Sequence, residues 1–323
     1  MSKRLMLAAA ALVAGAGAIL YFVQADRYAA FSGEVFVDIP LGTSTPRVAA
    51  MLAEAGVVRH PLLFLAARAL HPRLRPQAGE YRFAEPATPA EILRRLARGD
   101  VYTIELRVPE GTDVFDLAQL VEAAGLGRAE EFLRLALPHE GYLFPSTYFF
   151  RRQTRPEQIV ETMRAQFERV WRELGGQGGV HATVTLASLI EKETAVAEER
   201  PLIASVFRNR LERRMPLQCD PTTIYAAMLD GRWRGAIHRS DLDREHPYNT
   251  YRISGLPPGP IANPGRESLA AALRPADTDF TYFVAKADGS GAHVFSASLE
   301  AHNRAVWRFR NGPRQALRQD QGR

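Results

Sequence analysis

The sequence contains a single cysteine, Cys219, which excludes an intramolecular disulfide and leaves the redox compartment open. Lysine is also scarce, so arginine supplies almost all of the positive charge. A net charge of +5 over 323 residues fits an anionic polymer or a membrane surface. This charge is too small to indicate nucleic acid, and no motif of a nucleic-acid-binding domain is found.

Further absences exclude several catalytic classes. The eight histidines show no His-x-x-x-His or comparable spacing, so no metal site is expected. The sequence has neither a glycine-rich phosphate loop nor a Gly-x-Ser-x-Gly elbow, which argues against nucleotide-phosphate and serine-hydrolase chemistry. We therefore expect no cofactor.

The N-terminus carries the one long uncharged run. Lys3 and Arg4 precede residues 5–23, and such a run at helical rise approaches the ~30 Å thickness of the hydrocarbon core. The basic flank predicts that residues 1–4 are cytoplasmic and that the rest of the chain faces outward. Residues 14–16 also resemble a signal-peptide cleavage site. The run continues beyond them without a polar break, which favours an uncleaved transmembrane anchor.

The segment after the anchor alternates short strands with short helices. Thr88 and Glu91 form a capping-box pattern, Pro89 occupies the first helical position, and Gly99 ends the helix. We expect a small α+β module over residues 33–136. Its predicted elements are strands over 33–40 and 79–83, helices over 43–58 and 88–99, and a strand–turn–helix cycle over 102–126.

A second domain is expected over residues 140–311. It begins with EGYLFPSTYFF, whose last nine residues include five aromatics that form either a buried plug or a wall for stacking sugar rings. A helix is predicted from Thr154, with Thr154 and Glu157 as its capping box. The next helix is predicted to run to Arg200 and Pro201. The polar tail, residues 312–323, is expected to be disordered.

The stretch LASLIEKETA carries two glutamates, Glu191 and Glu193, on this predicted helix. At about 100° per residue the two side chains point roughly 160° apart. They therefore cannot act as a pair on one glycosidic bond, which needs carboxyl groups about 5–10 Å apart. Glu193 shares the apolar stripe made by Leu186, Leu189, Ile190, Val196 and Ala197.

A carboxyl group in such a stripe has two interpretations. Loss of hydration raises its pKa, and a carboxyl that stays protonated near neutrality suits a general acid for glycosidic cleavage. Alternatively, Glu193 forms a buried salt bridge to Arg200 or to a distant arginine. Helical position alone leaves both interpretations open. The remaining charged residues nearby are expected to be solvated: Glu191, Lys192, Glu198 and Glu199.

Several blocks carry a family resemblance. IEKETAVAEER, VFRNRL, LQCDPT, YNTY, GLPPGPIANPG and TYFVA…HVF occur in this order over about residues 140–305. Together they resemble the MltG-type (YceG-like) endolytic lytic transglycosylases of bacterial cell walls. EGYLFPSTY is similar to the start of that family's domain, although Ser146 stands where an aspartate is expected.

The resemblance implies an α+β fold with an N-terminal transmembrane helix, a LysM-like small module and a mixed α+β domain with a lysozyme-like catalytic helix. It implies cleavage of the β-1,4 bond between N-acetylmuramic acid and N-acetylglucosamine in nascent peptidoglycan. The products would carry 1,6-anhydro ends, and the cleavage would limit strand length. The implied location is the inner membrane, single-pass, with the catalytic domain in the periplasm. Membrane-bound cell-wall synthases are the implied protein partners.

The catalytic glutamate of the family corresponds to Glu193, which agrees with the helical-face argument. The C6 hydroxyl of the muramoyl ring would be the nucleophile, so no second carboxylate is required. Asp220 is expected to form an Asp-Pro turn, whereas a position across the bond would favour hydrolysis by water. Asp220 is also a candidate substrate-binding residue, together with Gln218, Tyr225, Tyr248, Asn249 and Tyr251, and for each of them a structural role remains open. A muramidase-type hydrolase and a non-catalytic peptidoglycan-binding scaffold are the alternative functions.

Overall fold

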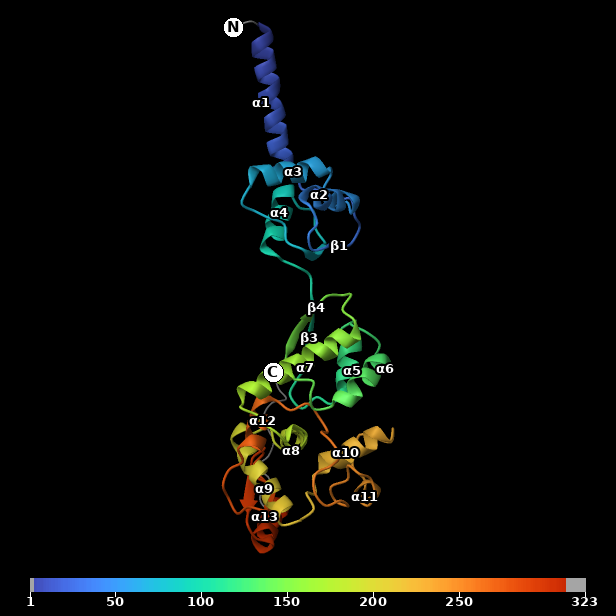
Figure 1. Cartoon of the computed structure of the whole chain (residues 1–323), viewed down its shortest axis with the longest axis vertical. Coiled ribbons are helices and arrows are strands. Elements are labelled where there is room, and N and C mark those ends of the chain that lie inside the picture. The colour runs from blue at the N-terminus through green and yellow to red at the C-terminus, as the bar shows by residue number, and fades with distance from the viewer. Residues whose placement is uncertain (1–2, 312–323) are drawn as a thin grey trace. The chain divides into compact units, whose positions relative to one another are not determined.

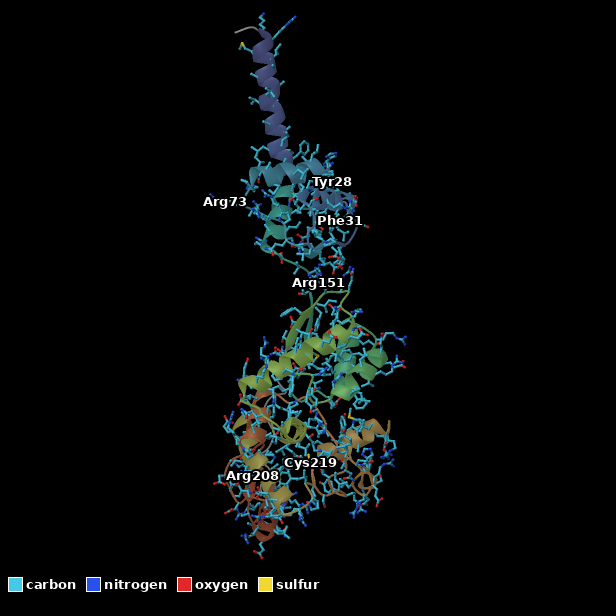
Figure 2. The ribbon with its side chains drawn as sticks, in the orientation of Figure 1. Tyr28, Phe31, Arg73, Arg151, Arg208 and Cys219 are labelled. Carbon is cyan, nitrogen blue, oxygen red and sulfur yellow. The ribbon has the colours of Figure 1, made fainter. Side chains whose placement is uncertain are left out.

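The computed structural model describes residues 3–311. The first two residues of the expected cytoplasmic segment, and the tail 312–323 that was expected to be disordered, lie outside the described residues. The chain divides into two compact units, Met1–Ile104 and Glu105–Arg323. Figure 1 shows the elements of each unit along the chain, and Figure 2 shows the same view with the side chains as sticks.

The first unit begins with α1 (Lys3–Gln24), an apolar helix that is exposed along most of its length. Its segment Met6–Gln24 is long and apolar enough to cross a membrane. Its end packs on α3 and α4 of the same unit, where Val23 is fully buried. The expected uncharged helix is therefore present, with the length of a membrane span.

After α1 the first unit contains a strand, two helices, a second strand and a third helix. β1 and β2 pair antiparallel, with Val37 opposite Tyr81, and Tyr81 is fully buried. The predicted capping box of α4 is confirmed, since Thr88 and Glu91 each bond the backbone of the other, and Gly99 takes a left-handed conformation. The bounds are β1 (Val35–Ile39), α2 (Thr45–Glu54), α3 (Pro61–Leu70), β2 (Gly79–Phe83) and α4 (Pro89–Arg98).

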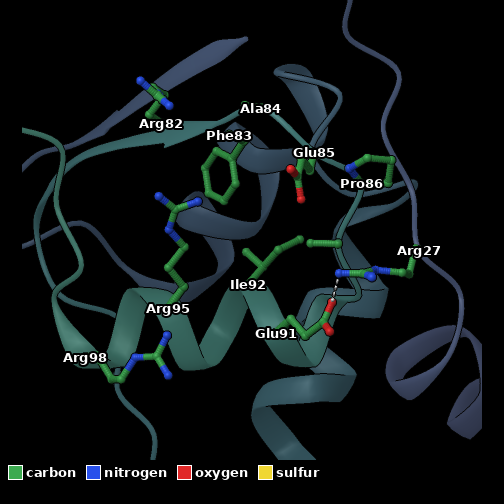
Figure 3. Close-up of a pocket in the computed structure, with 11 residues that line it drawn as sticks. Arg27, Arg82, Phe83, Ala84, Glu85, Pro86, Glu91, Ile92, Arg95 and Arg98 are labelled. Carbon is green, nitrogen blue, oxygen red and sulfur yellow. Dashed lines mark ion pairs between the residues drawn. The ribbon is translucent and has the colours of Figure 1, made fainter. Parts of the chain in front are cut away.

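A hollow of about 380 Å³ lies beside α4 and is rich in arginine (Figure 3). Arg27 contacts Glu91 at 3.5 Å, and Arg95 contacts Asp100 at 3.3 Å while it also lies over the ring of Phe83. These are half-exposed surface ion pairs, which contribute little to stability. None of the catalytic or sugar-binding residues predicted from the sequence lies in this hollow.

The second unit is mostly helical around α8, and its four strands pair only in twos. β3 pairs with β4, and β5 pairs antiparallel with β6. Its elements are β3 (Ile104–Arg107), α5 (Val114–Ala123), α6 (Ala129–Ala136), η1 (Leu137–His139), β4 (Thr147–Phe150), α7 (Pro156–Glu173), α8 (Val180–Glu193), η2 (Ala197–Glu199), α9 (Arg200–Glu212), α10 (Asp220–Leu229), α11 (Arg239–Leu242), α12 (Arg266–Leu273), β5 (Tyr282–Ala285), β6 (His293–Ser296) and α13 (Leu299–Asn311).

The division between the units falls earlier than the expected module boundary at residue 136. Residues 105–136 belong to the second unit. β3 finds its partner in β4, about forty residues later, and α6 packs against α5 and α7. The local strand–turn–helix pattern resembles a repeat of the first module, but its packing partners lie downstream. Ser146 contributes to this sheet, because its carbonyl accepts the backbone N–H of Val108 at 2.9 Å.

The aromatic entry segment is mainly a buried plug. Phe144, Tyr148 and Phe150 are buried, whereas Phe149 is 63% exposed. The Tyr148 hydroxyl donates to the carbonyl of Phe144 at 2.5 Å. Only the aromatic side chains of this segment that reach the surface, such as Phe149, could therefore stack on a sugar ring.

The predicted capping box of α7 was placed one residue too early. The helix begins at Pro156 with Arg155 as its cap, and the Gln158 side chain accepts the Arg155 backbone N–H at 2.9 Å. Thr154 and Glu157 do not form the expected pair. Pro156 at the first helical position makes Arg155 the cap. The predicted pair, Thr154 with Glu157, and the observed pair, Arg155 with Gln158, have the same three-residue spacing, so spacing did not distinguish them.

Helix α8 ends at Glu193, which is earlier than expected. Thr194 is extended (φ −146°, ψ 138°), and its hydroxyl accepts the Val196 backbone N–H at 3.0 Å. Val196 and Ala197 therefore do not continue the helical stripe, and α9 begins at Arg200. Glu193 is the last helical residue, so its carboxyl lies at the edge of the core.

Candidate active site

Glu193 opens onto a cavity of about 270 Å³ in the second unit. Segments far apart in the sequence build the cavity: the end of α8, α9, the loop before α10, the loop at residue 251, β5 and α13. The lining is predominantly polar, as expected for a site that binds a hydrated ligand such as a sugar. The lining residues are Glu193, Arg210, Leu217, Gln218, Asp220, Tyr251, Phe283 and His302.

Burial raises the pKa of Glu193 above its ordinary value, and the nearby negative charge of Asp220 raises it further. A hydrogen bond from the Cys219 thiol and the charges of His293 and Arg210 act in the opposite direction without cancelling the rise. Glu193 has no ion-pair partner within residues 3–311. The expected raised pKa is confirmed, and burial together with Asp220 accounts for it.

Glu191 is not solvated, contrary to expectation. Its side chain is 5% exposed; one carboxylate oxygen lies 3.3 Å from the Arg200 guanidinium, and the other accepts the Gly265 backbone N–H at 2.8 Å. Arg200 was considered as a partner for Glu193, but it pairs with Glu191. The helical angle of about 100° per residue placed Glu191 away from the apolar stripe, on the side that was expected to be solvated. That side of α8 is also packed against other residues, since Ala187 is fully buried.

Two neighbours of these glutamates also have structural contacts. Lys192, which is exposed as expected, donates to the carbonyl of Gly111 at 3.1 Å. Glu199 was expected to be solvated but is 8% exposed. Its carboxylate accepts the His293 backbone N–H and contacts His293 Nδ1, both at 2.7 Å. Glu191 and Glu199 are therefore buried and bonded, and of these three glutamates Glu193 is the one that lines the cavity.

Three of the predicted sugar-contacting residues reach the cavity: Gln218, Asp220 and Tyr251. The Tyr251 hydroxyl donates to Asp220 Oδ1 at 2.5 Å. Asp220 was expected to form a turn, but it is the first residue of α10, followed by Pro221. An acidic residue and a proline are both favoured in the first helical turn, so the Asp-Pro pair starts a helix here.

Tyr225 and Tyr248 are not brought to the cavity. Tyr225 is 3% exposed, and its hydroxyl donates to Glu140 at 3.1 Å, while the ring of Tyr248 packs against it at 5.1 Å. Glu140 also accepts from the Val114 backbone and from Asn263. Burial raises the pKa of Glu140 to about 8. Glu140 and its three partners form a buried hydrogen-bond network that connects α5, α10 and the loop that contains Asn263.

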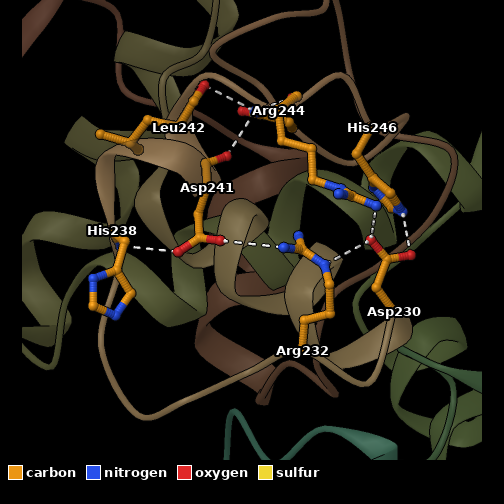
Figure 4. A network of polar contacts seen from close by, with 8 residues as sticks. Asp230, Arg232, His238, Asp241, Leu242, Arg244 and His246 are labelled. Atoms are coloured by element: carbon orange, nitrogen blue, oxygen red, sulfur yellow. Dashed lines mark hydrogen bonds and ion pairs between the residues drawn. The ribbon is translucent and has the colours of Figure 1, made fainter.

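Asn249 has a structural role as well. It is 1% exposed, and its amide donates to the carbonyls of Asp241, Leu242 and Arg244 at 2.7–3.2 Å. Figure 4 shows the polar network to which Asp241, Leu242 and Arg244 belong, and in it Arg244 contacts Asp230 at 2.9 Å. Asn249 thus fixes the segment that leads to Tyr251, and it lies outside the cavity lining.

Arg210 and His302 also line the cavity, and neither was predicted as a site residue. Arg210 is buried and donates to the carbonyls of Thr281, Pro216 and Leu217, which fixes the loop before α10. Burial lowers the pKa of His302, which favours its neutral form. A signal existed for Arg210, because it lies in the VFRNRL block. Nothing in the sequence singled out His302.

The model of the YceG-like family matches residues 37–308. The chain belongs to the YceG-like family. This YceG-like chain is 34% identical over 309 residues to a Bacillus subtilis protein named endolytic murein transglycosylase, covering 85% of this chain and 84% of that protein.

Two further relatives agree with this assignment. A Streptococcus pneumoniae protein of the same name is 28% identical over 84% of the YceG-like chain, and the match spans 58% of the longer pneumococcal protein. A crystal structure of a yceG-like protein from Listeria monocytogenes superposes with a TM-score of 0.56 at 30% identity, covering 84% of this chain and 99% of that one. The family resemblance predicted from the motifs is confirmed.

Proposed function

We propose that the protein is an endolytic peptidoglycan lytic transglycosylase. It cleaves the β-1,4 bond between N-acetylmuramic acid and N-acetylglucosamine in nascent strands and leaves 1,6-anhydro ends, which limits strand length. The observation that carries the proposal is Glu193, a carboxyl with a raised pKa and no ion-pair partner among residues 3–311 that faces a polar cavity. The name of the Bacillus subtilis relative, endolytic murein transglycosylase, supports the reaction class.

The mechanism uses one carboxyl twice. Protonated Glu193 gives its proton to the leaving glycosidic oxygen as the bond from that oxygen to C1 of the muramoyl ring breaks. The C6 hydroxyl of the same ring then attacks C1, and its proton passes to the Glu193 carboxylate. One C–O bond breaks, another forms, no water is consumed, and Glu193 returns to its acid form. The nucleophile belongs to the substrate, so the enzyme needs no second catalytic carboxylate.

A muramidase-type hydrolase is the second candidate function, because Asp220 shares the cavity with Glu193. We assign Asp220 a different role. Its carboxylate is bonded by Tyr251, and its negative charge raises the pKa of Glu193. In this role Asp220 favours the acid form of Glu193 and does not activate water.

The first unit is proposed to anchor and position the enzyme. Its β1–α2–α3–β2 order, with the two strands antiparallel, supports the LysM-like assignment and a glycan-binding role. The apolar α1 supports a single-pass anchor in the inner membrane, with the chain that follows α1 in the periplasm. Nascent glycan strands are then within reach, and membrane-bound cell-wall synthases are the proposed partners.

Product analysis tests the proposed reaction. The full-length protein in detergent is incubated with purified glycan strands, and the new ends are identified by mass spectrometry. We expect ends that are lighter than a reducing end by one water, because the C6 oxygen replaces the leaving oxygen. New reducing ends would show that the protein is a muramidase-type hydrolase instead. If no new ends formed, the non-catalytic peptidoglycan-binding scaffold would be the remaining function.

A pH profile tests the role assigned to Asp220. Glu193 must be protonated to act, so activity falls as the pH rises through its pKa. Asp220→Asn removes a charge that raises this pKa, and we therefore expect the alkaline limb of the kcat profile to move to lower pH. Tyr251→Phe is the matched control, because it removes the 2.5 Å hydrogen bond and keeps the charge. An Asp220→Asn limb at or above the wild-type position would contradict the assignment.

A further inference from the structure

Two non-glycine residues among residues 3–311 have a positive φ, Arg214 at 56° and Gln218 at 51°. The left-handed conformation is sterically unfavourable for any residue with a Cβ. Arg214 has an ordinary reason for it. It lies just beyond the end of α9, where its N–H bonds the carbonyl of Leu211, and helices commonly end on a left-handed residue. Gln218 ends no helix.

Neighbouring contacts hold Gln218 in this conformation. Its backbone N–H donates to the carbonyl of Thr250 at 3.1 Å, and the next N–H, of Cys219, donates to the Thr250 hydroxyl at 2.9 Å. On the other side Arg210 donates to the carbonyl of Leu217 at 2.9 Å. The backbone is therefore fixed on both sides of Gln218. Strain that surrounding contacts maintain in this way is typical of functional sites.

The side chain of Gln218 lies where the strained backbone places it, on the lining of the cavity with Glu193 and Asp220. Gln218 is exposed, and its carboxamide has no hydrogen-bond partner among residues 3–311. It is the one carboxamide among the eight lining residues. The strained backbone is the observation that indicates a functional role, and the exposed carboxamide is the group that this backbone presents to a ligand in the cavity.

Building on the proposed function, we propose that Gln218 is a specificity residue that binds the 2-acetamido group of a sugar at the cleaved bond. A carboxamide offers N–H donors beside one carbonyl acceptor, and an acetamido group offers one N–H donor beside one carbonyl acceptor. The acetamido amide is trans, so its N–H and C=O point in opposite directions and Gln218 bonds one of them. We assign the bond in which the Gln218 amide N–H donates to the acetamido carbonyl. The Asp220 carboxylate only accepts hydrogen bonds, so it cannot donate to that carbonyl. The ligand class of the site is then N-acetylated glycan.

Three substitutions separate the amide from the strain. Gln218→Met keeps the side-chain length and the backbone strain but removes the amide. Gln218→Asn keeps a shorter amide on a residue that tolerates the left-handed region. Gln218→Gly removes both. Arg214→Gly is the matched control, because it relieves the same backbone strain away from the cavity.

The experiment measures kcat/KM of the full-length protein on N-acetylated strands and on the same strands after chemical N-deacetylation. We expect Gln218→Met to lower kcat/KM on acetylated strands by about 10–100-fold and to reduce the preference for them by a similar factor. Gln218→Asn should retain part of that preference. Gln218→Gly and Arg214→Gly should each raise Tm by about 2 °C, and Arg214→Gly should leave both activity and preference unchanged.

A Gln218→Met enzyme with the wild-type preference would overturn the inference. The same holds if Gln218→Gly is both more stable and fully active, because the strain would then serve no function. Failure of the wild-type protein to cleave any strand is a distinct result. It would overturn the proposed function and this inference together, whereas cleavage with unchanged preference would overturn the inference alone.

Discussion

Glu193→Gln is expected to lower the rate of strand cleavage by about 10⁴-fold, the upper range for loss of a general acid–base group. The amide is nearly isosteric with the carboxyl, but it has no acidic proton for the leaving oxygen and cannot take the proton of the C6 hydroxyl. The fold should persist, because Glu193 has no ion pair to lose within residues 3–311. The measurement is the amount of anhydro ends formed over time, with circular dichroism to verify folding.

Glu191→Gln is the matched control, since it makes the same chemical change two residues away on the same helix. Glu191 is bonded to Arg200 and to the Gly265 backbone and does not line the cavity. We expect this variant to cleave strands at a rate within about tenfold of the wild type at temperatures where it stays folded. Loss of activity in Glu191→Gln with retention in Glu193→Gln would reverse the assignment of the acid.

The sequence predicted correctly those contacts whose partners lie within a few residues of each other along the chain. Thr88 and Glu91 contact each other within one helical turn, so their capping box could be predicted from spacing alone. The helical wheel correctly separated Glu193 from Glu191. It could not place Glu191, because the partners of that carboxylate are Arg200 and Gly265, and the latter lies 74 residues away along the chain.

The loop blocks show the same limit in the candidate site. Sequence placed Gln218, Tyr225 and Asn249 in one group because they share the family's motifs. Tertiary contacts divide them: Tyr225 turns to Glu140, Asn249 binds three carbonyls, and the left-handed backbone of Gln218 places it on the cavity. A positive φ at a glutamine has no sequence signature, so only the structure could identify it.

Arg200→Met is expected to produce the largest loss of stability. It leaves the Glu191 carboxylate, whose side chain is 5% exposed, without its cation. Removing one partner of a buried pair typically costs about 3–5 kcal/mol. For a unit of this size that corresponds to a fall in Tm of about 10 °C. Glu110 also lies 3.8 Å from Arg200, and as a second carboxylate it cannot compensate. Calorimetry of the full-length protein measures the transition.

The double variant Glu191→Gln with Arg200→Met separates charge from packing. Its neutral amide can still accept the Gly265 N–H and leaves no buried charge, so we expect most of the lost Tm to return. An equal loss in the single and double variants would mean that the arginine acts by packing alone. The pair joins the end of α8 to the start of α9, and Glu193 and Arg210 are carried by these two helices. The double variant should therefore recover stability more fully than activity, because a neutral contact restrains this junction less tightly.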